Sequence, residues 1–258
     1  MAVDEAILRT HVNGEAPPTL RFYGWKPAAV SLGYFQRAAE EINIEKCRKL
    51  GIDVVRRLTG GRAVLHDTEL TYSIVVKEDH PLIPATITAS YRYFSQGVLA
   101  GLRKLGIDAE MSMPKAAYGQ PKPKHTSAAC FDAPSQYEIT AQGRKLVGSA
   151  QVRKLGAVLQ HGSILLSFNP VLLASLLNLP GLETEDRAAK MLGTRAIAAS
   201  TLLNRDIAWD EVYQAMLEAF GPALRVDLQL GRLSELEEKM TMELTNSKYS
   251  QDSWNLLR

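Results

Sequence analysis

A cysteine, a lysine and a pair of glycines carry the chemistry that this sequence offers. Cys130 follows a polar, basic stretch and precedes Ala133 and Pro134, a setting that predicts a partly exposed loop. A thiol near lysine or arginine side chains loses its proton more readily, and the resulting thiolate is a nucleophile that can hold an acyl group. The alternative is a small buried apolar residue, and the local sequence leaves both interpretations open.

Lys145 and the glycine pair also have two interpretations each. Lys145 stands where a predicted turn at Gly143 enters an apolar strand, so it either faces a ligand or protects an edge strand against aggregation. Gly60 and Gly61 either close a hairpin, because glycine adopts positive φ at low cost, or let the backbone approach a ligand closely. Cys47 is different, because its place in a predicted helix favours a structural role.

Several familiar sites are missing from the sequence. It contains no P-loop, no dinucleotide-binding glycine fingerprint, no His-Glu-x-x-His and no paired Cys-x-x-Cys, which argues against a mononucleotide P-loop and against a zinc site. The five histidines are dispersed along the chain, and His66 and His161 fit satisfied polar groups at strand ends.

Composition narrows the class of protein. The chain has 258 residues, 46% of them hydrophobic, and 30 basic side chains against 28 acidic ones. The resulting net charge of +2 favours neither nucleic acid nor a membrane as partner. The longest apolar stretches fall far short of the roughly 20 residues that span a bilayer, and we see no signal peptide. Two cysteines in a chain of 258 residues indicate a reducing compartment, so we expect a cytoplasmic protein.

Strands and helices must position these groups. The predicted strands cover residues 20–23, 28–33, 53–57, 70–76, 136–140, 145–151 and 157–166. The predicted helices cover residues 2–10, 42–50 and 89–105 and most of 171–258. We expect the strands on either side of the glycine turn to form a hairpin, the last three strands to form a meander, and residues 113–127 to form a basic loop that leads to Cys130.

Three motifs spread along the chain resemble the lipoate/biotin protein ligase superfamily. They are Arg56-Arg57-x-Thr59-Gly60-Gly61-Arg62-x-Val64-x-His66-Asp67, Gly143-Arg144-Lys145-x-x-Gly148-Ser149-Ala150-Gln151 and Gln160-His161-Gly162-Ser163. A fourth motif, Cys130-Phe131-Asp132-Ala133-Pro134-Ser135, is similar to the octanoyltransferase branch, which moves an octanoyl group from acyl carrier protein to the H protein of the glycine cleavage system. Segments 21–25, 32–36, 248–249 and 254–255 are also similar to that branch.

The resemblance implies an α/β fold of the α+β type, in which mixed, largely antiparallel sheets are flanked by helices. It implies a catalytic domain over residues 1–228 and a C-terminal helical tail, residues 229–258, packed on the same domain. Family members usually have a short strand before the first helix, and this chain starts at the position of that helix.

The resemblance also implies roles for individual residues. Cys130 would carry the acyl group as a thioester. Lys145 would lower the pKa of Cys130 and so favour the thiolate, and it would stabilise the developing oxyanion or act in acid–base catalysis. The implied acyl-binding and substrate-binding residues are Arg57, Thr59, Gly60, Gly61, Arg62, His66, Gly148, Ser149, His161 and Gly162.

The activity implied is that of an acyltransferase in lipoate biosynthesis. Octanoyl-acyl carrier protein would be the donor, and a lysine of a lipoyl-domain protein, such as the glycine cleavage H protein, would be the acceptor. Because the donor thioester is already activated, we expect no requirement for ATP or a metal, and we expect a monomer. The basic loop around residues 115–125 either docks the acidic carrier protein or is simply solvated.

Three other functions are compatible with parts of this pattern. An ATP-dependent lipoate or biotin ligase would share the fold and Lys145 but would not need Cys130. An amidotransferase that moves lipoyl or octanoyl groups between carrier domains would use a cysteine, with a protein amide as donor. A carrier-binding module without catalysis would keep the pocket and tolerate loss of the thiol.

Overall fold

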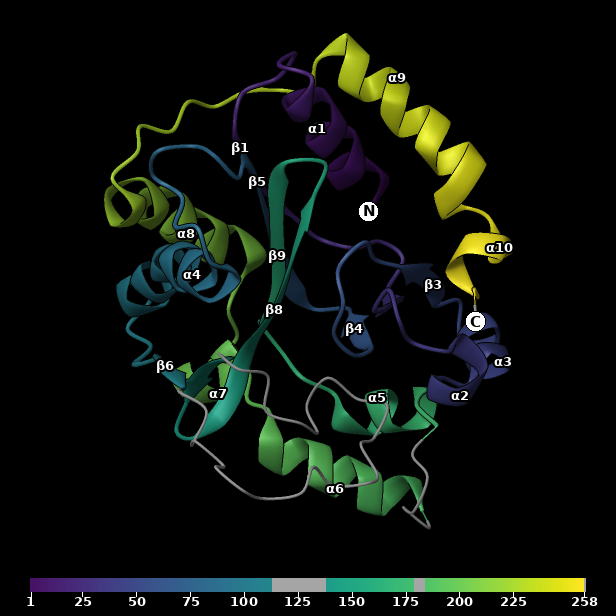
Figure 1. Cartoon of the computed structure of the whole chain (residues 1–258). Coiled ribbons are helices and arrows are strands. Elements are labelled where there is room, and N and C mark those ends of the chain that lie inside the picture. The colour runs from purple at the N-terminus through teal and green to yellow at the C-terminus, as the bar shows by residue number, and fades with distance from the viewer. Residues whose placement is uncertain (113–137, 179–183, 258) are drawn as a thin grey trace, which may run out of the picture.

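A six-stranded antiparallel sheet, which we call the main sheet, occupies the centre of the computed structural model, which describes residues 1–112, 138–178 and 184–257 (Figure 1). The long strands β5, β9 and β8 lie side by side in its middle. In spatial order the strands are β1 (Thr19–Tyr23), β5 (Glu69–Lys77), β9 (Ala157–Leu165), β8 (Arg144–Lys154), β7 (Glu138–Ala141) and β6 (Glu110–Ser112).

Helices α4 (Ile87–Lys104) and α8 (Trp209–Leu224) pack together and cover one face of the main sheet (Figure 1). Alternate residues of β5, such as Leu70 and Tyr72, point into the hydrophobic core that these helices complete. The residues between them point to the opposite face, where α1 (Ala2–Val12) packs. The main sheet therefore presents a helical core on one side and a partly polar face on the other.

A second sheet of three strands, the small sheet, lies beside the main sheet. Its central strand β2 (Ala29–Leu32) pairs in parallel with β3 (Asp53–Arg56) and antiparallel with β4 (Val64–His66). A separate hydrophobic cluster joins this sheet to neighbouring helices. The short helices here are α2 (Ala38–Glu41), α3 (Ile44–Lys49), α5 (Pro170–Leu176) and α6 (Glu185–Arg195), and α7 (Ala199–Leu203) follows α6.

The C-terminal segment lies against both α1 and the small sheet. It consists of α9 (Glu235–Leu244), the π-helix η1 (Thr245–Tyr249) and α10 (Asp252–Asn255). Lys248 and Tyr249 both donate hydrogen bonds of 2.6 Å to Glu5 of α1. The backbone N–H of Arg56 donates to Asn255 Oδ1, and its guanidinium donates to C-terminal carbonyls. The segment 235–257 thus links α1 to the end of β3.

The predicted fold class and the meander are confirmed. Strands β7, β8 and β9 are consecutive antiparallel neighbours, and their two turns place Gln142-Gly143 and Leu155-Gly156 at positive φ. Two adjacent positive φ angles are what a tight type I′ hairpin requires.

The predicted hairpin around the glycine turn is wrong. Strands β3 and β5 belong to different sheets, because the chain after Gly61 first forms β4 on the far side of β2. Strand β4 has only three residues, too few for its alternation to be recognised in the sequence.

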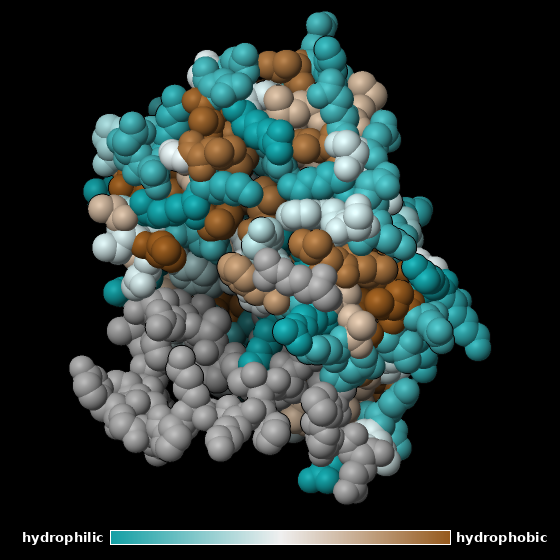
Figure 2. Space-filling model, turned by 45° about the vertical axis from the view of Figure 1, so that its right-hand side comes forward, coloured by the Kyte–Doolittle hydropathy of each residue, from teal (hydrophilic) through white to brown (hydrophobic). Residues whose placement is uncertain are grey.

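The surface of the protein is mixed. On the face shown in Figure 2, hydrophilic side chains separate small groups of hydrophobic ones. Within the described ranges, no helix combines the length and the apolar character needed to cross a membrane.

Candidate active site

A cavity of about 200 Å³ lies where the main sheet meets the small sheet. It brings together residues from all three motifs that lie in the described part of the chain. Its described walls are Met1, Ser31, Arg57, Gly61, Arg62, Val64, His66, Thr71, Lys145, Gly148, Ser149, Ala150, His161, Gly162 and Ser163. Among the implied binding residues, only Thr59 and Gly60 stand behind this wall, in the glycine turn. Cys130 lies outside the described residues, as does the basic loop that precedes it.

Arg57 holds the glycine turn against the small sheet. Its Nη1 donates to both the carbonyl and the hydroxyl of Ser31, each at 2.7 Å, and its Nη2 donates to the carbonyls of Gly60 and Arg62, each at 3.0 Å. Gly61 has a φ of +94°, which disfavours any side chain there. The turn is therefore fixed by a buried guanidinium and does not behave as a loose loop.

Strand β9 carries a glycine at the cavity, where neighbouring side chains fill the space that a Cβ would occupy. A Cβ added to Gly162 would lie 2.3 Å from Ser149 Oγ and 2.6 Å from Tyr72 Cε1. Ser149 Oγ in turn is 2.8 Å from Tyr72 Oη. This wall of the cavity needs glycine at position 162 for its packing.

Lys145 lies at the start of β8 with only 4% of its surface exposed. Its Nζ donates a 2.6 Å hydrogen bond to Glu138 Oε1 on the neighbouring strand β7, and this pair is an ion pair. Its carbonyl accepts from the N–H of Ile197 at 2.9 Å, which fixes the start of the strand. The carboxylate favours the ammonium form of the lysine, so Lys145 brings a positive charge to the cavity.

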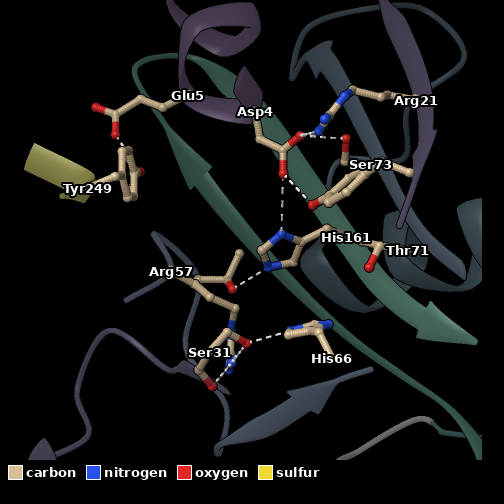
Figure 3. Close-up of polar contacts among 12 residues, drawn as sticks. Asp4, Glu5, Arg21, Ser31, Arg57, His66, Thr71, Ser73, His161 and Tyr249 are labelled. Atoms are coloured by element: carbon tan, nitrogen blue, oxygen red, sulfur yellow. Dashed lines mark hydrogen bonds and ion pairs between the residues drawn. The ribbon is translucent and has the colours of Figure 1, made fainter. Parts of the chain in front are cut away.

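His161 stands between a hydroxyl and a carboxylate (Figure 3). Its Nε2 is 2.7 Å from Thr59 Oγ1, and its Nδ1 is 3.9 Å from Asp4 Oδ2, an electrostatic contact longer than a hydrogen bond. Burial lowers the pKa of His161 and outweighs the opposing effect of Asp4. The imidazole is therefore neutral near pH 7, and Nδ1–H facing Asp4 leaves Nε2 to accept from Thr59.

Asp4 is a buried carboxylate with strong support. It accepts hydrogen bonds of 2.9 Å each from Arg21 Nη1, Tyr23 Oη and Ser73 Oγ. Burial by itself would raise the pKa of Asp4, but His161, the α-amino group of Met1 and Arg21 hold that pKa well below its usual range. We call this group the His161 centre, consisting of His161, Thr59, Asp4, Arg21, Tyr23 and Ser73 (Figure 3).

His66 has a similar arrangement on the other side of the cavity. Its Nε2 is 2.7 Å from Ser31 Oγ, and its Nδ1 is 3.1 Å from Glu69 Oε1. The ring of Trp25 stacks on the imidazole, with 4.3 Å between ring centroids and 19° between planes. Thr71 donates to Glu69 Oε1 and accepts from Trp25 Nε1 at 2.8 Å. We call these five residues the His66 centre, part of which Figure 3 shows.

Glu69 differs from Asp4 in its charge balance. It is 2% exposed, and within residues 1–112, 138–178 and 184–257 it has no lysine or arginine as ion-pair partner. Its Oε2 is buried without a hydrogen-bond partner in that same part of the chain. Its hydrogen-bond partners in this part of the chain are His66 and Thr71, both at Oε1.

Sequence reasoning missed Asp4, Ser31, Glu69 and Thr71 as site residues. One signal was available for two of them, because Glu69, Thr71 and Ser73 alternate with apolar residues along β5. Such alternation normally predicts a solvent-facing polar side, yet all three are buried here. For Asp4, on a helix far from the motifs in sequence, we find no comparable signal.

In the described residues, no group of three or more histidine, cysteine, aspartate or glutamate side chains is placed to hold a metal ion.

Comparison with known proteins places this geometry in a family. The model of the lipoyl protein ligase A/B catalytic domain matches residues 1–221. An octanoyltransferase LipM from Anoxybacillus flavithermus is 45% identical, with 100% of this chain and 93% of the relative covered. The corresponding protein from Kyrpidia tusciae is 47% identical, with coverages of 99% and 93%.

Solved structures agree with these relatives. A bipartite lipoate protein ligase from Thermoplasma acidophilum, studied with its E2 lipoyl domain, is 31% identical with a TM-score of 0.81, covering 100% of this chain and 91% of its own. A lipoate-protein ligase A bound with ATP is 32% identical with a TM-score of 0.78, covering 99% and 92%. The resemblance drawn from the four motifs is thus confirmed, and the chain belongs to the lipoyl protein ligase A/B catalytic domain family.

Proposed function

We propose that this protein transfers an octanoyl group from octanoyl-acyl carrier protein to a lysine of a lipoyl-domain protein, through a thioester on Cys130 and without ATP or a metal. Octanoyl transfer in lipoate biosynthesis, predicted from the motifs, is confirmed by relatives that carry the name octanoyltransferase and match nearly the whole chain. The acyl-enzyme route and the two protein partners are our proposal.

The main observation in support of the acyl-enzyme route is a lysine side chain, Lys145, in the wall of the cavity. Lys145, ion-paired with Glu138, places a positive charge at the cavity. Gly148 of β8 and Gly162 of β9 also line this cavity. Such a charge favours a thiolate nearby and stabilises the oxyanion that forms when sulfur attacks a carbonyl carbon. In that step the Cys130 thiolate bonds to the octanoyl carbon and the carbon–sulfur bond of the donor breaks. The carrier protein leaves as a thiolate, which takes up the proton that Cys130 lost.

The second step forms an amide. The acceptor lysine nitrogen attacks the enzyme thioester, the carbon–sulfur bond breaks, and Cys130 recovers its electron pair. Because an amide is more stable than a thioester, the transfer runs downhill without nucleotide. The octanoyl chain itself adds roughly 0.8 kcal/mol of binding free energy for each methylene it buries.

The acceptor class follows from chemistry shared with the family. The Thermoplasma acidophilum ligase is described together with an E2 lipoyl domain. We propose a lipoyl domain, such as the glycine cleavage H protein, as the acceptor for this chain too. We further propose that the protein acts as a cytoplasmic monomer.

The fold does not separate a transferase from a ligase, because a ligase bound with ATP has nearly the same structure. The test is acceptor octanoylation, measured by mass, with octanoyl-acyl carrier protein and no nucleotide. We expect the wild type and Cys47→Ala to transfer and Cys130→Ala to be inactive. Cys47 is the matched control, since it is a buried cysteine of α3 that does not line the cavity.

Two results would overturn the proposal. Transfer by Cys130→Ala at the wild-type rate would exclude the thioester route. Product formed only from free octanoate with ATP would identify a ligase instead.

A further inference from the structure

The second step of the proposed function, on which this inference rests, requires a proton acceptor. A lysine side chain with a pKa of about 10.4 is an ammonium ion near pH 7, and an ammonium nitrogen has no electron pair to donate. A group at the cavity must therefore take one proton from the acceptor lysine before attack.

Few described side chains of the cavity can act in this way. Besides the α-amino group of Met1, the basic groups are those of Arg57, Arg62, Lys145, His66 and His161. Arginine stays protonated in proteins, and Lys145 is held as an ammonium ion by Glu138. The α-amino group of Met1 interacts electrostatically with Asp4 of the His161 centre. Among the side chains, the two histidines remain.

Charge balance argues against His161. Its carboxylate partner Asp4 is already paired with Arg21 at 2.9 Å. A proton on His161 would add an uncompensated positive charge to a buried centre, and burial lowers the pKa of His161 accordingly.

Charge balance favours His66. Its partner Glu69 is buried and has no lysine or arginine of its own within the described ranges, so a proton on the imidazole meets a carboxylate that otherwise lacks a full countercharge. Arg57, a cation of the same hydrogen-bond network, donates to Ser31. We propose that His66 is the general base that accepts the proton of the acceptor lysine, with Ser31 as the hydroxyl that relays it and Glu69 as the residue that stabilises the imidazolium.

The hydrogen-bond directions agree with this role. Arg57 donates to Ser31 Oγ, so the Ser31 hydroxyl keeps its own proton for His66 Nε2. Nε2 is then the acceptor, and Nδ1–H donates to Glu69. Carboxylate, imidazole and hydroxyl stand in the order that activates nucleophiles in hydrolases, although here the hydroxyl passes a proton on and forms no covalent bond.

The proton transfer balances as follows. The lysine N–H bond breaks, its proton goes to Ser31 Oγ, and the Ser31 proton moves to His66 Nε2. The freed nitrogen electron pair attacks the thioester carbon, and the sulfur leaves with the electron pair of the carbon–sulfur bond. The second amine proton goes to that sulfur, so the products are an amide, a thiol and protonated His66, which releases its proton to solvent.

The test separates the two half-reactions. Acyl-enzyme is prepared from octanoyl-acyl carrier protein and then chased, in single turnovers, either with a lipoyl domain that carries its target lysine or with hydroxylamine. Hydroxylamine is unprotonated at neutral pH, so it needs no base. For His66→Gln we expect adduct formation and the hydroxylamine chase to stay within about twofold, and the lysine chase to slow about 100-fold.

Two further variants keep the test decisive if His66→Gln folds poorly. Glu69→Gln preserves the shape of the His66 centre but removes its charge, and we expect the lysine chase to slow about tenfold with an unchanged hydroxylamine chase. His80→Gln, at a histidine that does not line the cavity, is the matched control and should behave like the wild type.

Three results would overturn the inference. An unchanged lysine chase in His66→Gln and Glu69→Gln would exclude the base. Equal slowing of both chases, or loss of adduct formation, would assign His66 to geometry rather than to proton transfer. Failure of the wild type to form any adduct would overturn the proposed function itself, and the base assignment with it, and this result is distinguishable from the others.

Discussion

The His161 centre and the His66 centre contain the same three kinds of group in the same order, namely a buried carboxylate, an imidazole and a hydroxyl. In both, the hydroxyl belongs to the small sheet or the glycine turn, and the carboxylate belongs to the main sheet or α1. They differ in what else the carboxylate contacts. Asp4 accepts from Arg21, Tyr23 and Ser73, whereas Glu69 has Thr71 and His66.

Within the described residues, the presence of an arginine beside one carboxylate and not the other suggests different roles for the two histidines. A carboxylate that already forms an ion pair with a guanidinium has little need of a second cation. The histidine beside it therefore stays neutral and has a structural role in the cavity wall. A carboxylate without one stabilises a proton that arrives on its histidine. Both centres therefore lie between the same two sheets, and under the proposed mechanism it is the His66 centre that changes its charge during the reaction.

Amidation of the two carboxylates should give the largest contrast in stability. Asp4→Asn removes the buried carboxylate that pairs with the partly buried Arg21, and we expect a loss of about 3 kcal/mol in the free energy of unfolding. Glu69→Gln removes a charge that no lysine or arginine offsets, so we expect a loss of about 1 kcal/mol. Denaturant unfolding of both variants measures the difference, and equal losses would contradict the proposed charge balance.

Deletion of one hydroxyl in each centre should give a smaller contrast. Thr71→Val removes a donor from Glu69 and an acceptor from Trp25, and we expect a cost of about 2 kcal/mol. Ser73→Ala should cost about 1 kcal/mol, because Asp4 keeps Arg21 and Tyr23. The same unfolding measurement applies, and a reversed order would show that Asp4 depends on each of its donors.

The dependence of stability on pH should give the smallest effect. Because burial lowers the pKa of His161, the unfolded chain binds a proton below about pH 6.5 that the native chain does not bind. Native stability should therefore fall as the pH drops below about 6.5, by at most about 1.4 kcal/mol per pH unit from this residue, until the pH passes below the native pKa.

His161→Gln tests that slope. Unfolding measured between about pH 6.5 and pH 5 should depend less on pH in this variant than in the wild type. A further loss below about pH 4 should remain, because the pKa of Asp4 is also held below its usual range and the unfolded aspartate takes up a proton there first. If the pH dependence of the unfolding free energy between about pH 6.5 and pH 5 were the same in both proteins, His161 would not be the neutral, structural histidine proposed above.

Part of the site was predictable from the sequence because it lies in local patterns. The glycine turn, the Lys145 strand and the His161 strand were each recognisable, and the meander that holds the last two is made of short hairpins with positive-φ turns. The cavity brings these segments together as expected.

The rest depends on long-range pairing that local patterns do not encode. Asp4 meets His161 only because α1 packs over β9, and Ser31 meets His66 only because the short strand β4 pairs with β2 instead of forming the expected hairpin. Glu69 carries a polar pattern typical of an exposed strand face, and only the packing of α1 and the small sheet buries it.

The proposed acyl-enzyme is tested most directly by the intact mass of the protein after incubation with octanoyl-acyl carrier protein in the absence of nucleotide. We predict that the wild type gains the mass of one octanoyl group, that Cys130→Ala gains none, and that the added mass disappears when a lipoyl domain is supplied. An unmodified wild-type chain that still octanoylates the acceptor, or an adduct that persists in Cys130→Ala, would contradict the account.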